Sequence, residues 1–188
     1  MKALVVVASL IAGSAHAEPL AFKGLPMGAD QQQLTQQFPS LRCEKVPPQF
    51  SRLGEQRCTG APCSGDACRA SEKALASYGG MPAWDTGFAV VDGRVAAFDL
   101  AINSSSYEAV RDALRDAHGV GAESEVAMQL RTGAKFTSRL WTVKTAAGKI
   151  SLHERAVKYD EGRLQAESSA FTRWLETAAK SKKNSGDL

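Results

Sequence analysis

The sequence lacks three features: an excess of charge of one sign, a long internal apolar run and a concentration of histidine. Acidic and basic residues are equal in number over residues 18–179, whereas binding several nucleic-acid phosphates requires a concentrated basic face. After residue 17, no apolar run approaches the roughly 18 residues that a membrane span needs. We therefore expect no nucleic acid among the partners and no transmembrane span.

The first residues have the pattern of a cleaved secretory signal. Met1-Lys2 leads into an apolar run over residues 3–12, and Ala15-His16-Ala17 is an A-x-A cleavage site. A signal this short is typical of bacteria, so we expect a protein of the periplasm or the external medium, from a Gram-negative bacterium. The expected division is a signal peptide over 1–17, one domain over 18–179 and a flexible basic tail over 180–188.

All four cysteines lie close together, in the spacing C-x14-C-x4-C-x4-C. An even number of cysteines in an exported chain predicts disulfides, and four cysteines allow three pairings. We expect Cys43–Cys58 and Cys63–Cys68, because each bond then closes a short local loop. A zinc site would need closer pairs in two clusters, and only Cys63 and Cys68 come near that spacing. A Cys-x-x-Cys redox motif is absent from the sequence.

Two hairpins are the clearest structural signal. Residues 88–91 and 94–102 flank Asp92-Gly93, which suits a type I′ turn. On the second strand Phe98 and Leu100 share the core face. Asp99 points to the other face, which is otherwise lined by small residues. Residues 139–145 and 149–155 predict the second hairpin. A turn at 160–162 joins residues 157–159 to a further strand at 164–166.

Capping signals place helices between these strands. Asp30 with Gln33, and Ser105 with Glu108, match the capping-box pattern. We expect helices over about 30–38, 70–77, 105–119 and 171–178, an irregular segment over 43–68, and a solvated linker at Glu123 and Glu125. The predicted fold class is α+β, an antiparallel sheet built from hairpins with helices packed on one face and a disulfide-stapled N-terminal loop.

Several short motifs resemble a group of small exported bacterial α+β proteins for which no activity is established. They are Phe22-x-Gly24 with Gly28, Cys43, Tyr78-Gly79-Gly80, Asp92-Gly93-Arg94, residues 113–119, Trp141, residues 148–152 and Gly162-Arg163-Leu164. The layout is also distantly similar to β-lactamase inhibitor proteins and small outer-membrane assembly lipoproteins, although the chain lacks the anchoring cysteine of the latter. This resemblance implies a role in protein binding.

Motifs of catalysis are scarce. The sequence contains no G-x-S-x-G, and neither a phosphate loop nor a dinucleotide fingerprint is complete. We therefore predict no catalytic residue, no cofactor and no metal site. Arg139, Trp141 and His153 are the candidate binding residues: Trp141 shares a strand face with Arg139, an arrangement that suits a binding patch or ordinary cross-strand packing. His153 is expected on an exposed sheet face.

These observations favour a non-enzymatic periplasmic binding module, such as an inhibitor or an accessory protein of the envelope, with another envelope protein as its partner. One alternative is an envelope hydrolase whose site is assembled from distant segments, which spacing along the chain does not exclude. The other alternative is a thiol-disulfide redox protein that uses Cys63 and Cys68.

Overall fold

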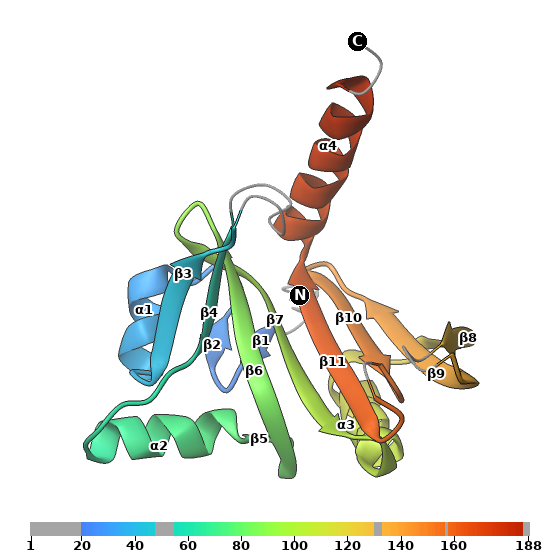
Figure 1. Ribbon diagram of the computed structural model, residues 1–188, viewed down its shortest axis with the longest axis horizontal. Coiled ribbons are helices and arrows are strands. Elements are labelled where there is room, and N and C mark those ends of the chain that lie inside the picture. The colour runs from blue at the N-terminus through green and yellow to red at the C-terminus, as the bar shows by residue number, and fades with distance from the viewer. Residues whose placement is uncertain (1–19, 48–54, 130–132, 157, 186–188) are drawn as a thin grey trace, which may run out of the picture.

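The computed structural model describes residues 20–47, 55–129, 133–156 and 158–185 (Figure 1). The expected signal peptide therefore lies outside the described residues. The strands are β1 (Ala21–Phe22), β2 (Leu25–Pro26), β3 (Leu41–Lys45), β4 (Gln56–Gly60), β5 (Ser77–Tyr78), β6 (Met81–Val91), β7 (Arg94–Asn103), β8 (Ala122–Gln129), β9 (Lys135–Lys144), β10 (Gly148–His153) and β11 (Glu161–Ser168). The helices are α1 (Gln31–Gln37), α2 (Asp66–Leu75), α3 (Tyr107–His118) and α4 (Ser169–Ser185), with a 3-10 turn at Ser104–Ser106.

One antiparallel sheet dominates the fold. Its strands follow the order β3-β4-β6-β7-β11-β10-β9-β8, with β5 paired to β6. Six of the pairs join consecutive strands, namely β3–β4, β5–β6, β6–β7, β8–β9, β9–β10 and β10–β11. On its other side β11 pairs with β7, so it lies between β7 and β10. The predicted α+β class is confirmed. Within the described residues, no helix has the length and hydropathy that a bilayer crossing requires.

The core lies on the face of the sheet that the β1–β2 hairpin, α1 and α3 cover. Phe22 of β1 contacts Phe38, Phe88 and Phe98, with ring centroids 5.7, 5.3 and 5.1 Å away. Tyr107, Val110 and Leu114 of α3 belong to the same buried cluster, as their helical spacing requires. The other end of this cluster is formed by side chains of β9 to β11, namely Trp141, Val143, Ile150, Leu152, Leu164 and Ala166.

The predicted start of α1 is confirmed and that of α3 is wrong. The Asp30 side chain accepts a hydrogen bond from the Gln33 backbone, and Gln33 returns one to Asp30, which completes the capping box. Before α3, however, the side chain of Asn103 accepts the hydrogen bond from the Ser105 backbone N–H, 2.9 Å away. Asn103 therefore caps a 3-10 turn that leads into α3, and Ser105 with Glu108 is not the cap. The end of α3 at Gly119 is as predicted.

Both predicted disulfides are present, but the segment around them is more regular than its composition indicates. Cys43 of β3 and Cys58 of β4 are directly opposite each other in an antiparallel pair and are disulfide-bonded. The second bond joins Cys63 to Cys68 in the first turn of α2. Cys58 is fully buried in the core. The prediction of an irregular segment over 43–68 is therefore wrong at both strands.

Further boundaries differ from the sequence-based expectation. Helix α2, predicted over 70–77, is Asp66–Leu75, and the strand predicted over 88–91 begins already at Met81. Glu123 and Glu125 belong to the edge strand β8, and not to a linker. Lys158 and Tyr159 lie in the turn before β11, while Val157 lies outside the described residues. Helix α4 begins directly after β11, projects beyond the sheet (Figure 1) and continues to Ser185, across most of the segment assigned to the basic tail. The flexibility of that tail stays a prediction.

Candidate binding groove on the open face of the sheet

The face of the sheet opposite the core is lined by small residues at its centre. Ala89 of β6 lies directly opposite Ala97 of β7, and Gly87 lies opposite Asp99. Because side chains alternate along a strand, these positions fall between the core residues Phe88, Phe98 and Leu100. The short side chains leave a hollow between β4 and β11. The alternation on β7 predicted this small-residue face correctly from Ala97 to Ala101, whereas Val95 lies in the core beyond a register shift.

Walls rise on two sides of this hollow and make it a groove. One wall comes from the ends of β3 and β4, with Glu44, Lys45, Val46 and Pro47; the other comes from Phe171 and Leu175 of α4. The groove encloses about 690 Å³, a volume typical of small-molecule and peptide-side-chain sites. Its lining combines apolar side chains with charges of both signs, including Arg42, Arg57, Asp99 and Glu167.

A bridged carboxylate lies at the floor of the groove. Asp99 forms ion pairs with Arg57 of β4 and with Arg163 of β11, whose Nε donates to Oδ2 at 3.0 Å. The Asp99 side chain is 11% exposed, Arg163 17% and Arg57 37%. Arg163 also lies 3.5 Å from Asp85. Burial alone would lower the pKa of Arg163, but the hydrogen bond and attraction of Asp99 outweigh it and raise that pKa. The Arg163 guanidinium therefore stays charged beside Asp99.

Gly87 makes the Arg57–Asp99 pair possible. Arg57 lies two strands away from Asp99, so its guanidinium has to pass over β6. A Cβ at position 87 would lie 2.7 Å from Arg57 Cζ and 2.8 Å from its Nε, which is closer than nonbonded atoms approach. The absence of a side chain at Gly87 therefore lets the guanidinium lie against the strand.

Arg139 and Trp141 occur together, as predicted, but on the core face of the sheet. Trp141 is 2% exposed and belongs to the core cluster. The Arg139 guanidinium lies 4.5 Å from the centre of the Tyr107 ring, donates to Glu154 at 3.2 Å and contacts Glu108. Its hydrogen bonds to Glu154 and Glu108 raise the pKa of Arg139, and the same bond to Glu154 lowers the pKa of that carboxyl. This network links α3 to β9 and to Glu154, the residue that follows β10.

His153 lies on the opposite, open face, between its cross-strand neighbours Leu140 and Arg163. It is half-buried, and its Nδ1 has no hydrogen-bond partner among the described residues. Burial, and secondarily the charge of Lys149, lower the pKa of His153, so the neutral form is favoured. The three residues singled out from the sequence therefore do not form one patch.

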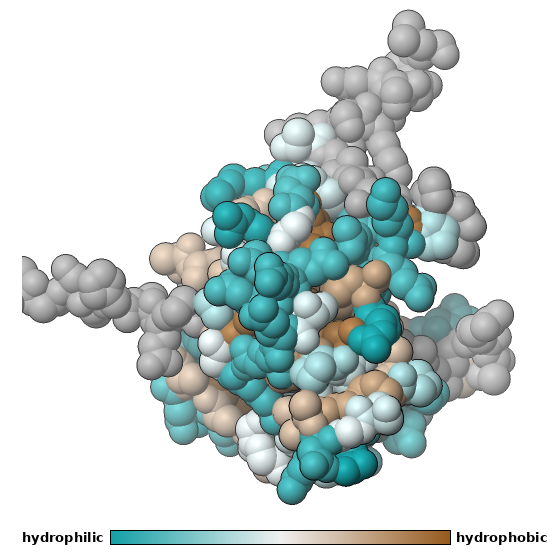
Figure 2. Space-filling view, turned by 90° about the vertical axis from the view of Figure 1, so that its left-hand side faces the viewer, coloured by the Kyte–Doolittle hydropathy of each residue, from teal (hydrophilic) through white to brown (hydrophobic). Residues whose placement is uncertain are grey.

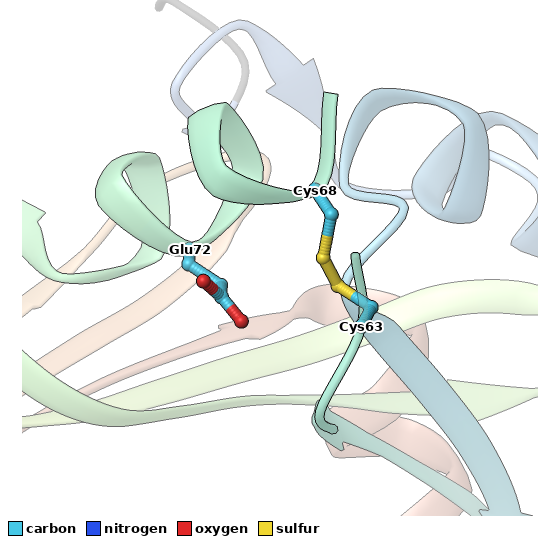
Figure 3. Close-up of side chains that lie close together, drawn as sticks. All are labelled: Cys63, Cys68 and Glu72. Carbon is cyan, nitrogen blue, oxygen red and sulfur yellow. A yellow bond between two sulfur atoms is a disulfide. The ribbon is translucent and has the colours of Figure 1, made fainter. Parts of the chain in front are cut away.

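A second cluster of chemically active groups lies at the start of α2. Cys63, Cys68 and Glu72 place their sulfur and carboxylate atoms within 4.8 Å of one another (Figure 3). The two sulfurs are bonded to each other, and metal binding by cysteine requires thiolates. In this disulfide-bonded form the cluster offers only the Glu72 carboxylate to a cation.

The outer side of the molecule at α1 and β3 differs from the open face. Figure 2 views this side, where hydrophilic residues predominate and the hydrophobic ones form small separate patches among them. Such scattered apolar residues are ordinary on protein surfaces. The groove on the open face is therefore the better candidate for a binding site.

Comparisons with family models, with curated proteins and with solved structures found no match. The candidate site consequently stands on its own geometry. Sequence reasoning did not single out Arg57, Asp99 or Arg163 as site residues. The available signal was Asp99 itself, an acidic residue within the otherwise apolar run 95–102 of β7.

Proposed function

We propose that this protein is a non-enzymatic binding module, and that the groove on the open face binds an extended segment of a partner protein. The observation that carries the proposal is the combination of apolar and charged groups in one groove. Phe171 and Leu175 provide an apolar wall, the alanines of β6 and β7 a shallow floor, and Arg57 with Asp99 a fixed charge pair.

A polypeptide segment suits this lining better than a ligand of one chemical type. The groove presents charges of both signs, so it attracts neither anions nor cations alone. They are Arg42, Lys45 and Arg57 with Glu44, Glu55, Asp99 and Glu167. A peptide supplies both charges along with apolar side chains. The described residues that line the groove include no histidine, the side chain most often used for proton transfer, and no serine or cysteine nucleophile. This composition favours binding over catalysis.

Peptide binding in the groove can be tested with a variant whose larger side chain occupies the groove floor. A library of random peptides is selected on the purified protein, and the affinities of the recovered peptides are measured by calorimetry. Ala97→Leu places a larger side chain on the groove floor without removing any polar contact. We expect this variant to lose at least about tenfold in affinity, because a ligand can no longer reach the floor.

Thr142→Leu is the matched control. Thr142 lies on the same open face, in the row of cross-strand neighbours that also contains Asp99, but it does not line the groove. The Thr142→Leu variant should bind the selected peptides with the same affinity as the unmodified protein. Peptides that bind Ala97→Leu as tightly as the unmodified chain, or a selection that recovers none, would refute the proposed use of the groove.

We also propose that the chain is exported to the periplasm or the medium, where its partner would be another envelope protein. Its two disulfides support this location, because such bonds persist in oxidising compartments. Kinship with small exported bacterial α+β proteins belongs to the same proposal. N-terminal sequencing of the protein recovered from cells tests it: a chain that begins at Glu18 supports export, and one that retains residues 1–17 opposes it.

A further inference from the structure

Strand β8 forms an open edge of the sheet. It has eight residues and pairs with β9 on one side only. Among the described residues, no backbone hydrogen bond involves its outward side. The opposite edge, β3, is shorter, with five residues, and the Arg42 side chain donates to the carbonyls of Leu41 and Pro39 there. The long edge at β8 is thus the better template for another strand.

The side chains of β8 limit such pairing only through the charges of Glu123 and Glu125. Proteins commonly block exposed edges with lysine, proline or a bulge, and β8 contains neither lysine nor proline and pairs with β9 in unbroken register. On the open face, half-buried Val126 and Met128 lie beside Ser138 and Phe136 of β9. The acidic residues both point to the core face, where Glu123 already accepts from Arg111 at 3.3 Å.

We propose that β8 pairs antiparallel with β8 of a second copy of this chain, so that one sheet runs through a symmetric dimer. A two-fold axis perpendicular to the sheet keeps the core faces of both copies on the same side. Residues that face each other in an antiparallel pair point to the same side of the sheet, so facing residues are an even number of positions apart. The axis must then pass between two copies of one residue, which faces itself.

Charge selects the residue on the axis. With Ser124 on the axis, Glu123 would face Glu125 of the other copy; with Glu125 on the axis, the two Glu125 carboxylates would face each other. Like charges directly opposite destabilise a sheet. An axis at Val126 places Glu123 opposite Gln129 and Glu125 opposite Ala127. An axis at Ala127 also separates the charges, but fewer residues of the strand then pair.

The register centred on Val126 joins apolar side chains across the interface. Val126 faces Val126, and Met128 faces Ser124, whose neighbour on β9 is Leu140. A stripe of half-buried apolar groups therefore becomes continuous over the open face of both copies. The groove lies near β3, at the far end of the strand order. Both grooves stay accessible, on the same face of the joined sheet.

Cysteine scanning of β8 tests the register directly. Val126→Cys would place two cysteines directly opposite each other, with Cα atoms about 4.5–5.5 Å apart, within the range of a disulfide. All cysteines of the described chain are already paired, so the new thiol has only its copy as partner. Ser124→Cys is the matched control, because its two copies would lie about 13 Å apart along the strands.

We expect Val126→Cys to form a cross-linked dimer at least about tenfold faster than Ser124→Cys under mild oxidation. Sedimentation should show the unmodified protein passing from one to two copies as its concentration rises, while Val126→Lys stays monomeric with an unchanged circular dichroism spectrum. Equal cross-linking rates for the two cysteine variants would reject the register. An unmodified protein that stays monomeric at every concentration would reject the dimer.

Discussion

The guanidinium of Arg57 reaches across Gly87 of the intervening strand to form an ion pair with Asp99. The pair joins β4, in the cysteine-bonded part of the fold, to β7, in the centre of the sheet. Arg163 binds the same carboxylate from β11. Three strands distant in sequence are thus held by one side chain on the floor of the groove, so the site and the sheet are stabilised together.

Replacing Asp99 by asparagine should destabilise the fold. The change leaves two partly desolvated guanidinium groups without their carboxylate. Removing one partner of a fully buried ion pair costs roughly 3–5 kcal/mol; because Arg57 is partly exposed, we expect about 2 kcal/mol here. Urea unfolding measures the change. Asp116→Asn, at an exposed position of α3, should shift stability by less than about 0.5 kcal/mol, and equal effects of the two variants would contradict the prediction.

Gly87→Ala should lower the free energy of unfolding only while Arg57 is present. The added methyl group displaces the guanidinium from Asp99, so the variant should lose about 1 kcal/mol of stability. In an Arg57→Ala background the clash is absent, and the same substitution should have almost no effect. The double-mutant cycle, measured by urea unfolding, isolates this coupling. Additive effects of the two changes would show that Gly87 does not act through Arg57.

Stability should fall as the solution becomes acidic, in the range where histidine titrates. The pKa of His153 is lowered in the folded protein by burial and by Lys149, so the unfolded chain binds the proton more readily. The stability from this site is complete above the unfolded pKa near 6.5 and is lost as the pH falls below it. His153→Gln should weaken the dependence of stability on pH between about 7.5 and 5.5. An unchanged pH profile in the variant would contradict this assignment.

Glu154 makes a separate contribution to the pH dependence of stability, at lower pH than His153. Its pKa is lowered by the hydrogen bond from Arg139, so its stabilising effect is present above the unfolded pKa and is lost at lower pH. Glu154→Gln should therefore leave the histidine range unchanged and reduce the loss of stability below about pH 4.5. Thermal unfolding measured across both ranges separates the two residues.

The two disulfides should differ in their effect on stability. Cys43–Cys58 closes a separation of 15 residues and Cys63–Cys68 one of 5. On the chain-entropy model the first contributes about 3 kcal/mol and the second about 2 kcal/mol. Paired alanine variants, compared by urea unfolding, test the order. Losing Cys43–Cys58 should loosen β3 and β4 while the β6–β7 and β9–β10 hairpins stay protected from hydrogen exchange. Loss of protection in those hairpins as well would show that the bond supports the whole sheet.

Local signals in the sequence determined much of this fold. Asp92-Gly93 adopts positive φ values at both residues of the β6–β7 turn, the capping box of Asp30 forms, and both disulfides join cysteines close in sequence. Each depends on neighbouring residues or a short loop, so residue type is sufficient to specify it. The two faces of β7 follow from alternation between Ala97 and Ile102, but a register shift opposite Ala89 and Val90 brings Val95 into the core. The cap of α3 failed because the Asn103 side chain accepts the hydrogen bond from the Ser105 backbone N–H, the donor that a capping box assigns to the Glu108 side chain. Spacing does not show which of these two acceptors prevails.

Only the tertiary structure decided how distant elements meet. The insertion of β11 between β7 and β10 brings Arg163 to Asp99, and the pairing of β3 and β4 with β6 brings Arg57 to the same carboxylate. Trp141 resembled an accessible residue in the sequence, yet α3 packs over its face and buries it. Strand pairing between distant segments depends on all the apolar faces of strands and helices that must be buried together. The groove is therefore not specified by any short stretch of sequence, whereas the turns are.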